Sequence, residues 1–326
     1  MHIWQELAAR GKPFSVLAPM EEVSDDAFRS LLCEIGRPDV FFTEFTSVEG
    51  MQSAGRDHVI HRLKMSPTQS PVIAQIWGTT PEFFEQTACD IVSIGGFAGI
   101  DINMGCPVKK IIKGGACGGL IQNPILATEI YMATLRGAGK LPVSIKTRIG
   151  FSTLATESWI GHLLDTCKPA ALTVHGRTVK EESKVPVHLE ELAKINALRQ
   201  QFSPDTTIIA NGDIDSVNAG KKLCTELGFD GYMIGRGVFH NPWVFDSNIN
   251  PATKNIEQKL NILLHHTHLF VQTWGTSKNF AILRRFFKIY ASGFEGATAL
   301  RVALMECKSE AEVQTVITHF LKKQIV

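Results

Sequence analysis

The chain has 326 residues, a formal net charge of +1, 44% hydrophobic residues and 20% charged residues. This composition supplies a sizeable core and excludes wholesale disorder. The near-neutral charge gives no sign of a protein that binds nucleic acid through overall basicity. Seven cysteines without paired spacing exclude a disulfide framework or a CxxC zinc site, and they favour a reducing, cytoplasmic setting.

The first twelve residues lack the apolar segment of a signal peptide, and no run reaches the ~18 apolar residues of a spanning helix. We therefore expect no membrane span, and the sequence suggests neither a metal site nor an obligate protein partner. Charge is distributed unevenly. Residues 244–326 contain 10 Lys and Arg against 6 Asp and Glu, so the C-terminal part is the more basic one.

Eight short apolar runs alternate with segments that have helical periodicity. Most of the runs are apolar at consecutive positions, which is typical of parallel strands buried on both faces. They lie at 15–18, 40–43, 72–76, 99–103, 143–147, 171–175, 207–211 and 231–234, and amphipathic helices are expected at 82–95, 124–137 and 218–227. Eight such units predict a TIM (β/α)₈ barrel over residues 1–246 rather than an open sheet.

The pattern changes after residue 243, where no further strand-like run occurs. Segments 256–274, 279–292, 297–305 and 309–323 have helical periodicity. A boundary is expected near 246–256, where Asn, Pro and Ser collect. We therefore predict that the barrel is followed by a small all-α C-terminal domain over residues 247–326.

The last two expected strands end in glycine-containing polar segments. Asn211-Gly212-Asp213 ends one strand, and Gly235-Arg236 follows the other. At this place in a barrel, glycines let backbone N–H groups approach a phosphate, and an arginine can pair with it. The two segments therefore predict a phosphate site, although tight turns alone would also use these glycines.

Three other strand ends carry Gln75, Lys146 and His175. A flavin ring needs a donor and an acceptor for its pyrimidine edge, and positive charge near N1. Gln75 suits the first role and Lys146 the second. Lys146 is also the residue type that forms a Schiff base in other barrels, and a lone histidine such as His175 is more often a hydrogen-bonded polar residue than a base.

The loop after the fourth expected strand presents Cys106. Gly105 and Pro107 shape a turn that projects this side chain beyond the strand. A thiol with an ordinary pKa of about 8.5 is mostly protonated at neutral pH, so it can deliver a proton to a carbanion formed by hydride addition. The alternative, a buried small hydrophobe, is the commoner fate of a free cysteine.

Together these segments resemble the tRNA-dihydrouridine synthase family, most closely its bacterial members. The likeness covers nearly the whole chain. Its segments are Ala18-Pro19-Met20, Phe28-Arg29, Thr43-Glu44, Gln75, Asp101-Ile102-Asn103-Met104-Gly105-Cys106-Pro107 with Lys109-Lys110, Lys146, His175-Gly176-Arg177-Thr178, Ile209 to Asp213, Met233 to Gly237, Arg284-Arg285, Tyr290, Gly293-Phe294, Gly296-Ala297 and Leu300-Arg301. The Cys106 stretch is the most specific of them.

The resemblance implies bound FMN, reduction by NADPH, and hydride transfer from flavin N5 to C6 of a uracil in tRNA, with Cys106 protonating C5. It implies an FMN site formed by Pro19, Met20, Glu21, Gln75, Lys146, His175, Asn211, Gly212, Asp213, Gly235 and Arg236. It also implies that the helical tail holds tRNA. Candidate contacts to the base and the tRNA are Asn103, Lys109, Arg148, Arg177, Arg284 and Arg285.

The chain departs from the family pattern at three positions. Cys117 precedes Gly118-Gly119 where the family has Gly and a small residue, Phe286 replaces a tail histidine, and Glu21 replaces a small residue after Pro19-Met20. Three alternative functions compete with the expected one. They are a flavin barrel reducing a free small molecule, resembling dihydroorotate oxidoreductases, a Schiff-base aldolase using Lys146, and a non-catalytic RNA-binding barrel.

Overall fold

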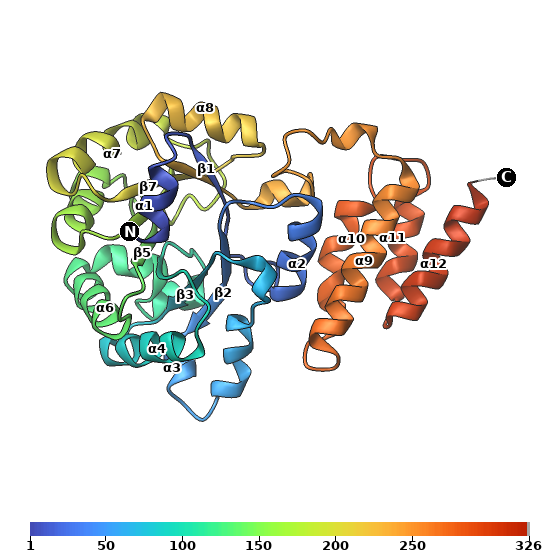
Figure 1. The fold of residues 1–326 in the computed structure, drawn as a ribbon, viewed down its shortest axis with the longest axis horizontal. Helices are drawn as coiled ribbons and strands as arrows, with labels where there is room; N and C mark the ends of the chain where they lie inside the picture. Colours follow the sequence, from blue (N-terminus) through green and yellow to red (C-terminus); the bar gives the residue numbers. More distant parts are fainter. Residues whose placement is uncertain (325–326) are drawn as a thin grey trace.

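Eight parallel strands close into a barrel in the computed structural model, which describes residues 1–324 (Figure 1). The sheet order is β1-β8-β7-β6-β5-β4-β3-β2. A parallel bridge between Val16 and Val40, with Leu17 N–H donating to Val40 O at 3.0 Å, joins the two ends. The expected barrel is therefore confirmed. Its strands are β1 (Phe14–Leu17), β2 (Phe41–Ser47), β3 (Val72–Trp77), β4 (Gly99–Met104), β5 (Val143–Arg148), β6 (Ala171–His175), β7 (Thr207–Asn211) and β8 (Gly231–Ile234).

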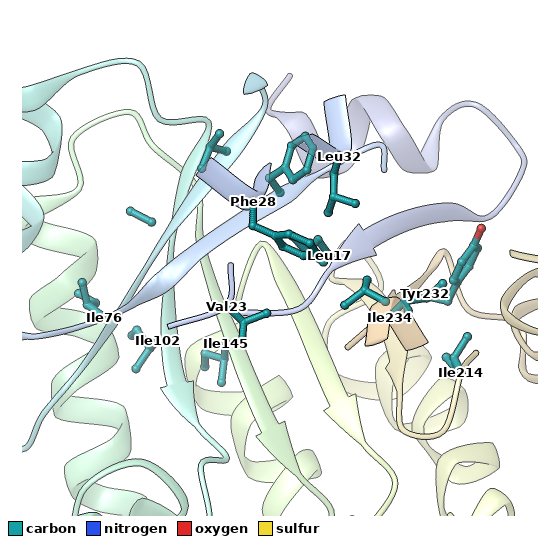
Figure 2. Packing of buried hydrophobic residues seen from close by; sticks show 14 of the residues in the cluster. Leu17, Val23, Phe28, Leu32, Ile76, Ile102, Ile145, Ile214, Tyr232 and Ile234 are labelled. Atoms are coloured by element: carbon teal, nitrogen blue, oxygen red, sulfur yellow. The ribbon is translucent and has the colours of Figure 1, made fainter. Parts of the chain in front are cut away.

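The strands are buried on both faces, as their mostly apolar runs predict. One core fills the barrel interior, where α1 (Ile3–Ala8) closes the N-terminal end with Trp4 and Leu7 against Phe14 and Phe42. A second core lies between the strands and the surrounding helices. Figure 2 shows part of it, with Ile76, Ile102, Ile145 and Ile234 among its labelled residues. Burial of each such side chain contributes about 1.5–3 kcal/mol.

Most of the helices around the barrel, although not α5 and α7, begin at side-chain caps or prolines. Asp25 accepts from Phe28 N–H at 3.0 Å, Asn123 from Leu126 N–H at 3.2 Å, and Ser216 from Ala219 N–H at 3.2 Å. The helices and single turns that follow β1 to β4 are α2 (Asp26–Ile35), α3 (Val48–Met51), η1 (Arg56–His58), η2 (Ile60–Leu63), η3 (Pro67–Gln69), α4 (Pro81–Ile94), α5 (Lys109–Lys113), η4 (Cys117–Gln122) and α6 (Pro124–Gly137).

The second half of the barrel is less regular. Two π-helical segments, η5 (Thr156–Ile160) and η6 (Leu163–Cys167), replace an α-helix after β5. After β6 and β7 come α7 (Leu189–Phe202) and α8 (Val217–Leu227), and β8 leads into a single 3₁₀ turn, η7 (Arg236–Phe239). Periodicity did not predict the π-helical segments, because their hydrogen-bond pattern differs from that of an α-helix by one residue.

The chain after the barrel is helical, as expected. Its elements are η8 (Pro251–Thr253), α9 (Ile256–Trp274), η9 (Phe280–Leu283), α10 (Arg284–Tyr290), α11 (Ala297–Glu306) and α12 (Glu310–Lys323). The helix expected at 279–292 is thus two elements, and Asn279 caps the first by accepting from Ala281 N–H at 2.9 Å. Among residues 1–324, no helix is long and apolar enough to cross a membrane.

The tail helices gather beside α2, on one side of the barrel (Figure 1). A buried charge cluster joins the two parts. The ammonium of Lys278 lies 3.2 Å from an Asp25 oxygen and 2.9 Å from a Glu44 oxygen, and it stands 4.1 Å from the ring centroid of Trp274. Trp274 Nε1–H also donates to Asp25 at 2.7 Å. An unpaired charge would be costly at this depth, so the cluster requires the tail and the barrel to stay together.

Candidate active site

A cavity of about 440 Å³ opens at the C-terminal end of the barrel. This is the end where barrel enzymes place their chemistry, because the βα loops converge there. Nine of the eleven expected cofactor residues line it, namely Pro19, Met20, Lys146, His175, Asn211, Gly212, Asp213, Gly235 and Arg236. The structure adds Ala18, Ile214, Asp215, Met233, Gly237 and His240 to the lining. Glu21 and Gln75 lie outside it.

The wall formed after β7 and β8 offers backbone donors. Gly212 has a φ of +118°, and a Cβ there would lie 2.8 Å from His175 Cδ2, so glycine is required on both counts. The N–H groups of Gly212, Asp213, Gly235 and Arg236 are unpaired in the hydrogen-bond network of residues 1–324. Unpaired amides beside an arginine are what a phosphate group needs. This part of the cavity therefore fits the phosphate of a flavin nucleotide.

Asp213 places a carboxylate at that wall, and two arginines neutralise it. Arg177 forms a bidentate pair with it, and Arg236 donates to Asp213 Oδ1 at 2.9 Å. These arginines, Arg177 first, lower the pKa of the Asp213 carboxyl. Arg236 is 60% exposed, which leaves it free to turn toward a bound anion.

Lys146 and His175 face the cavity from β5 and β6 in different charge states. Burial, reinforced by Arg148, lowers the pKa of Lys146 to about 8, and its ammonium donates to Asn211 Oδ1 at 2.9 Å. Burial also lowers the pKa of His175 well below its usual value, so the imidazole is neutral at pH 7. An arginine can only donate, so His175 Nε2 accepts from Arg177 at 3.3 Å and Nδ1 holds the proton.

Gln75 is held inside the barrel by its neighbours on β4. Gln75 Nε2 donates to Asp101 Oδ2 at 2.8 Å, and Gln75 Oε1 accepts from Asn103 Nδ2 at 3.1 Å. Ser144 donates to the other Asp101 oxygen at 2.7 Å. Because Asp101 accepts and Asn103 donates, the orientation of the Gln75 amide is fixed. One N–H and one lone pair of this amide remain for another partner.

Asn103 continues this network into the reactive loop. Its Oδ1 accepts from Gly105 N–H at 3.1 Å and from Cys106 N–H at 3.0 Å. The same residue pairs in register with Lys146 on β5. The amide of Asn103 therefore links the loop that carries Cys106 to the strand that carries a cavity residue.

The Cys106 thiol is more acidic than the sequence led us to expect. A hydrogen bond with the Cys117 thiol, assisted by the Val108 backbone and by Arg148 and Lys146, lowers its pKa to about 7 against the effect of burial. Burial raises the pKa of Cys117 well above its usual value. Cys106 is therefore about half protonated at neutral pH, which suits a general acid because its pKa matches the operating pH.

Arg148 and Arg177, the two arginines expected to hold a base, are nearly fully buried and bound to protein groups. Arg148 donates to the carbonyl oxygens of Gly105, Thr178 and Glu182 at 2.9–3.0 Å. Besides Asp213 and His175, Arg177 donates to Val185 O at 2.6 Å. These contacts brace the loops after β4 and β6. Both residues therefore position these loops and place positive charge next to them.

The remaining candidates lie around the rim. Glu21 has a partner in Arg62, whose Nε donates to it at 2.9 Å. Arg285 pairs with Glu22 and donates to Glu21 O at 3.3 Å, which places α10 against the loop after β1. The exposed Lys109 begins α5, and Arg284 begins α10. Within residues 1–324, no group of three or more His, Cys, Asp or Glu side chains is placed to hold a metal ion.

Comparison with known proteins decides the family. The model of the family described as "Dihydrouridine synthase (Dus)" matches residues 16–325. The chain belongs to the dihydrouridine synthase family. The expected family and enzyme class are thereby confirmed.

Two relatives of this dihydrouridine synthase match over nearly their full length. The "Probable tRNA-dihydrouridine synthase" of Staphylococcus aureus (strain MRSA252) is 42% identical over 322 residues, which cover 98% of this chain and 95% of the relative. The "Probable tRNA-dihydrouridine synthase 2" of Bacillus subtilis (strain 168) is 41% identical over 327 residues, covering 99% and 98%. Among solved structures, morphinone reductase is similar in fold, with a TM-score of 0.50 at 13% identity over 71% of this chain and 84% of that one.

Two residues that support the candidate site were not predicted from the sequence. Asp101 holds Gln75, and Lys278 holds Glu44, whose Oε1 accepts from Glu22 N–H at 2.6 Å in the loop after β1. For Asp101 a signal existed. Positions 101 and 103 of one strand face the same side, so a polar Asn103 directed into the barrel implied the same for Asp101. No comparable local signal marks Lys278.

Replacing Asp101 with asparagine is expected to lower the free energy of unfolding by about 1–3 kcal/mol. Asp101 accepts from two buried donors, and an amide offers only one oxygen to them. Urea unfolding measures the change, and the flavin dissociation constant should rise in parallel because Gln75 loses its fixed orientation. Asp165→Asn, at an exposed carboxylate of η6, is the matched control. Equal stability of the two variants would contradict the assigned role of Asp101.

Proposed function

We propose that this protein reduces the C5–C6 double bond of uridine in tRNA to dihydrouridine, with FMN as bound cofactor and NADPH as reductant. The observation that carries the proposal is Cys106, a thiol with a pKa of about 7 in a loop tied by Asn103 to a strand of the cofactor-sized cavity. Membership of the dihydrouridine synthase family supports the choice of uridine. A flavin-dependent reduction also gives roles to Cys106 and Gln75, which a Schiff-base aldolase using Lys146 would leave without a function.

Flavin binding is assigned to the residues that line the cavity. The amides after β7 and β8, with Arg236, would hold the phosphate, and Pro19 and Met20 would lie against the ring. Lys146 would set positive charge near N1, and Gln75 would offer its remaining N–H and lone pair to the pyrimidine edge. Bound in this way, the flavin would supply the hydride that uracil receives at C6.

The protein's own chemical step is then proton delivery by Cys106 to C5. The backbone N–H of Cys106 is held by Asn103, and Arg148 braces the carbonyl of Gly105, so the loop cannot swing away. The positive charges of Lys146, Arg148 and Arg177 would stabilise the negative charge that develops on the uracil ring when it receives the hydride. Thus the arginines act from beneath the loop, while Cys106 and Asn103 face the base.

For tRNA binding, we propose a division of the chain into a catalytic barrel at 1–246 and an RNA-binding tail at 247–326. The basic excess of the tail supports this division, as do the arginines that begin α10 beside the loop after β1. Lys109 extends the basic rim from the reactive loop. The target uracil must leave its stack to enter the barrel mouth, as in other enzymes that act on a base.

The proposal is tested by isolating the full chain, recording its visible spectrum, and incubating it with NADPH and tRNA lacking dihydrouridine. We expect a flavin spectrum, and nucleoside mass spectrometry should detect dihydrouridine only when tRNA, NADPH and protein are all present. Free uracil serves as a second substrate. A protein that reduces free uracil as fast as tRNA, or that cannot be loaded with flavin, would refute the proposal.

The pKa of Cys106 predicts how the rate depends on pH. An acid must be protonated to act, so the tRNA-dependent step should be fastest below pH 7 and should fall about tenfold per pH unit above it. Stopped-flow mixing of reduced protein with tRNA across pH 6–9 measures this step. Reduction by NADPH without tRNA is the internal control, and its rate should not show the decrease that deprotonation of Cys106 causes above pH 7. A flat tRNA-dependent profile would exclude Cys106 as the donor.

A further inference from the structure

The Cys106 loop and the segment that begins η4 lie against each other. Gly118 N–H donates to Cys106 O at 3.3 Å, and a Cβ at position 118 would lie 3.0 Å from that oxygen. Cys117, the neighbour of Gly118, is fully buried, and its thiol lies close enough to that of Cys106 for each to shift the pKa of the other. Two free thiols separated by eleven positions in the sequence are therefore adjacent in space.

The backbone at Cys117 is one that glycine would adopt without strain. Its φ is +52°, in the left-handed region that side chains with a Cβ rarely enter. Strained residues of this kind persist where the surroundings enforce them, and they cluster at functional sites. The strained backbone, the complete burial and the contact with Cys106 together point to a use for the sulfur of Cys117.

We propose that Cys106 and Cys117 form a reversible disulfide when the protein is exposed to hydrogen peroxide. Cys106 is then a site of oxidative modification as well as the proposed proton donor. In the first step the Cys106 thiolate attacks one peroxide oxygen. An S–O bond forms, the O–O bond breaks, and the departing hydroxide takes a proton to become water. The sulfur is oxidised to a sulfenic acid and the peroxide is reduced.

In the second step the sulfur of Cys117 attacks the sulfenic sulfur of Cys106. An S–S bond forms and the S–O bond breaks, and the leaving oxygen departs as water with the Cys117 proton. In sum, two thiols and one peroxide give one disulfide and two waters. Cys106 reacts first because it is the more exposed and more acidic thiol, and the buried Cys117 resolves it.

The disulfide removes the proton that Cys106 would donate, and it shields this sulfur from oxidation to sulfinic acid. A dithiol reductant reverses it. Disulfide formation requires only the two thiols, whereas its effect on tRNA reduction rests on the proposed function. The two can therefore be tested separately.

The test treats the full chain with hydrogen peroxide, blocks remaining thiols with iodoacetamide, and digests the protein with trypsin. Lys109, Lys110 and Lys113 lie between the two cysteines, so trypsin separates them, and only a disulfide keeps their peptides joined. We expect mass spectrometry to find this joined pair, and dithiothreitol to release it and restore tRNA reduction. Absence of the joined pair while Cys106 becomes sulfinic acid would overturn the proposal.

Substitutions of Cys117, with one control substitution, test whether this thiol forms the disulfide. Cys117→Gly suits the positive φ, and Cys117→Ser keeps the side-chain size; in both, Cys106 should proceed to sulfinic acid and dithiothreitol should no longer restore activity. Cys224→Ser, at a buried thiol of α8, should behave as the unaltered chain. If the unaltered chain and Cys117→Gly form sulfinic acid equally fast, the proposal fails. If untreated protein does not reduce tRNA, the proposed function fails, and the joined peptides still decide on the disulfide.

Discussion

Replacing Cys106 with alanine is expected to slow tRNA reduction by about 10²–10⁴-fold, the usual contribution of a positioned general acid. The alanine variant should retain its flavin, because Cys106 does not line the cavity whose amides and Lys146 are assigned to the cofactor. Flavin content comes from the visible spectrum, and the rate comes from dihydrouridine formed per unit time. Reduction by NADPH in the absence of tRNA should be close to that of the unaltered chain.

Two further variants separate acid chemistry from loop structure. Cys106→Ser keeps the size of the side chain but raises the pKa of the donor far above neutral pH, so it should resemble alanine in rate. Cys89→Ala removes an exposed thiol of α4 and should leave the rate unchanged. If Cys106→Ala reduces tRNA at the unaltered rate, another group supplies the proton and Cys106 loses its assigned role.

The barrel could be predicted from the sequence because its signal is local and repeated. Most strands are apolar at consecutive positions, and polar residues or glycines, such as Lys146, Asn211 and Gly235, lie at or just after their ends. In a parallel barrel all these ends meet at one rim, so the chain order alone places them together. Seven of the nine expected residues that line the cavity follow from this geometry, and the other two, Pro19 and Met20, follow from the family resemblance.

The charge network beneath the rim could not be predicted in this way. Sequence marks Arg148 and Arg177 as polar residues at strand ends, but it does not tell whether a guanidinium turns to a ligand or to a neighbouring loop. In the structure Arg148 donates to carbonyls of two loops, 30 to 43 residues away in the chain. Those carbonyls have no sequence signature, because every residue carries one.

The contact between the tail and the barrel could not be predicted from the sequence either, because its residues lie even farther apart in the chain. Lys278 meets Asp25 and Glu44 across 253 and 234 residues. Glu44 in turn accepts the backbone N–H of Glu22, in the loop whose Pro19 and Met20 line the cavity. The tail therefore supports the loop after β1 through Glu44, although none of residues 247–324 lines the cavity itself.

This arrangement predicts the cost of removing the charge of Lys278. Lys278→Met leaves Asp25 and Glu44 buried without their shared cation, which is expected to lower the free energy of unfolding by about 3–5 kcal/mol. Urea unfolding at neutral pH measures the loss. Lys288→Met changes an exposed lysine of α10 and should shift stability by no more than about 0.5 kcal/mol.

A double variant distinguishes an uncompensated charge from lost packing. Glu44→Gln keeps an oxygen for Glu22 N–H while removing one of the two stranded carboxylates, so Lys278→Met with Glu44→Gln should recover part of the lost stability. The flavin dissociation constant should follow the same order, because the loop after β1 is held through Glu44. If the double variant is less stable than Lys278→Met by the full effect of Glu44→Gln alone, the two residues are not coupled. In that case the tail does not support the cofactor site through this cluster.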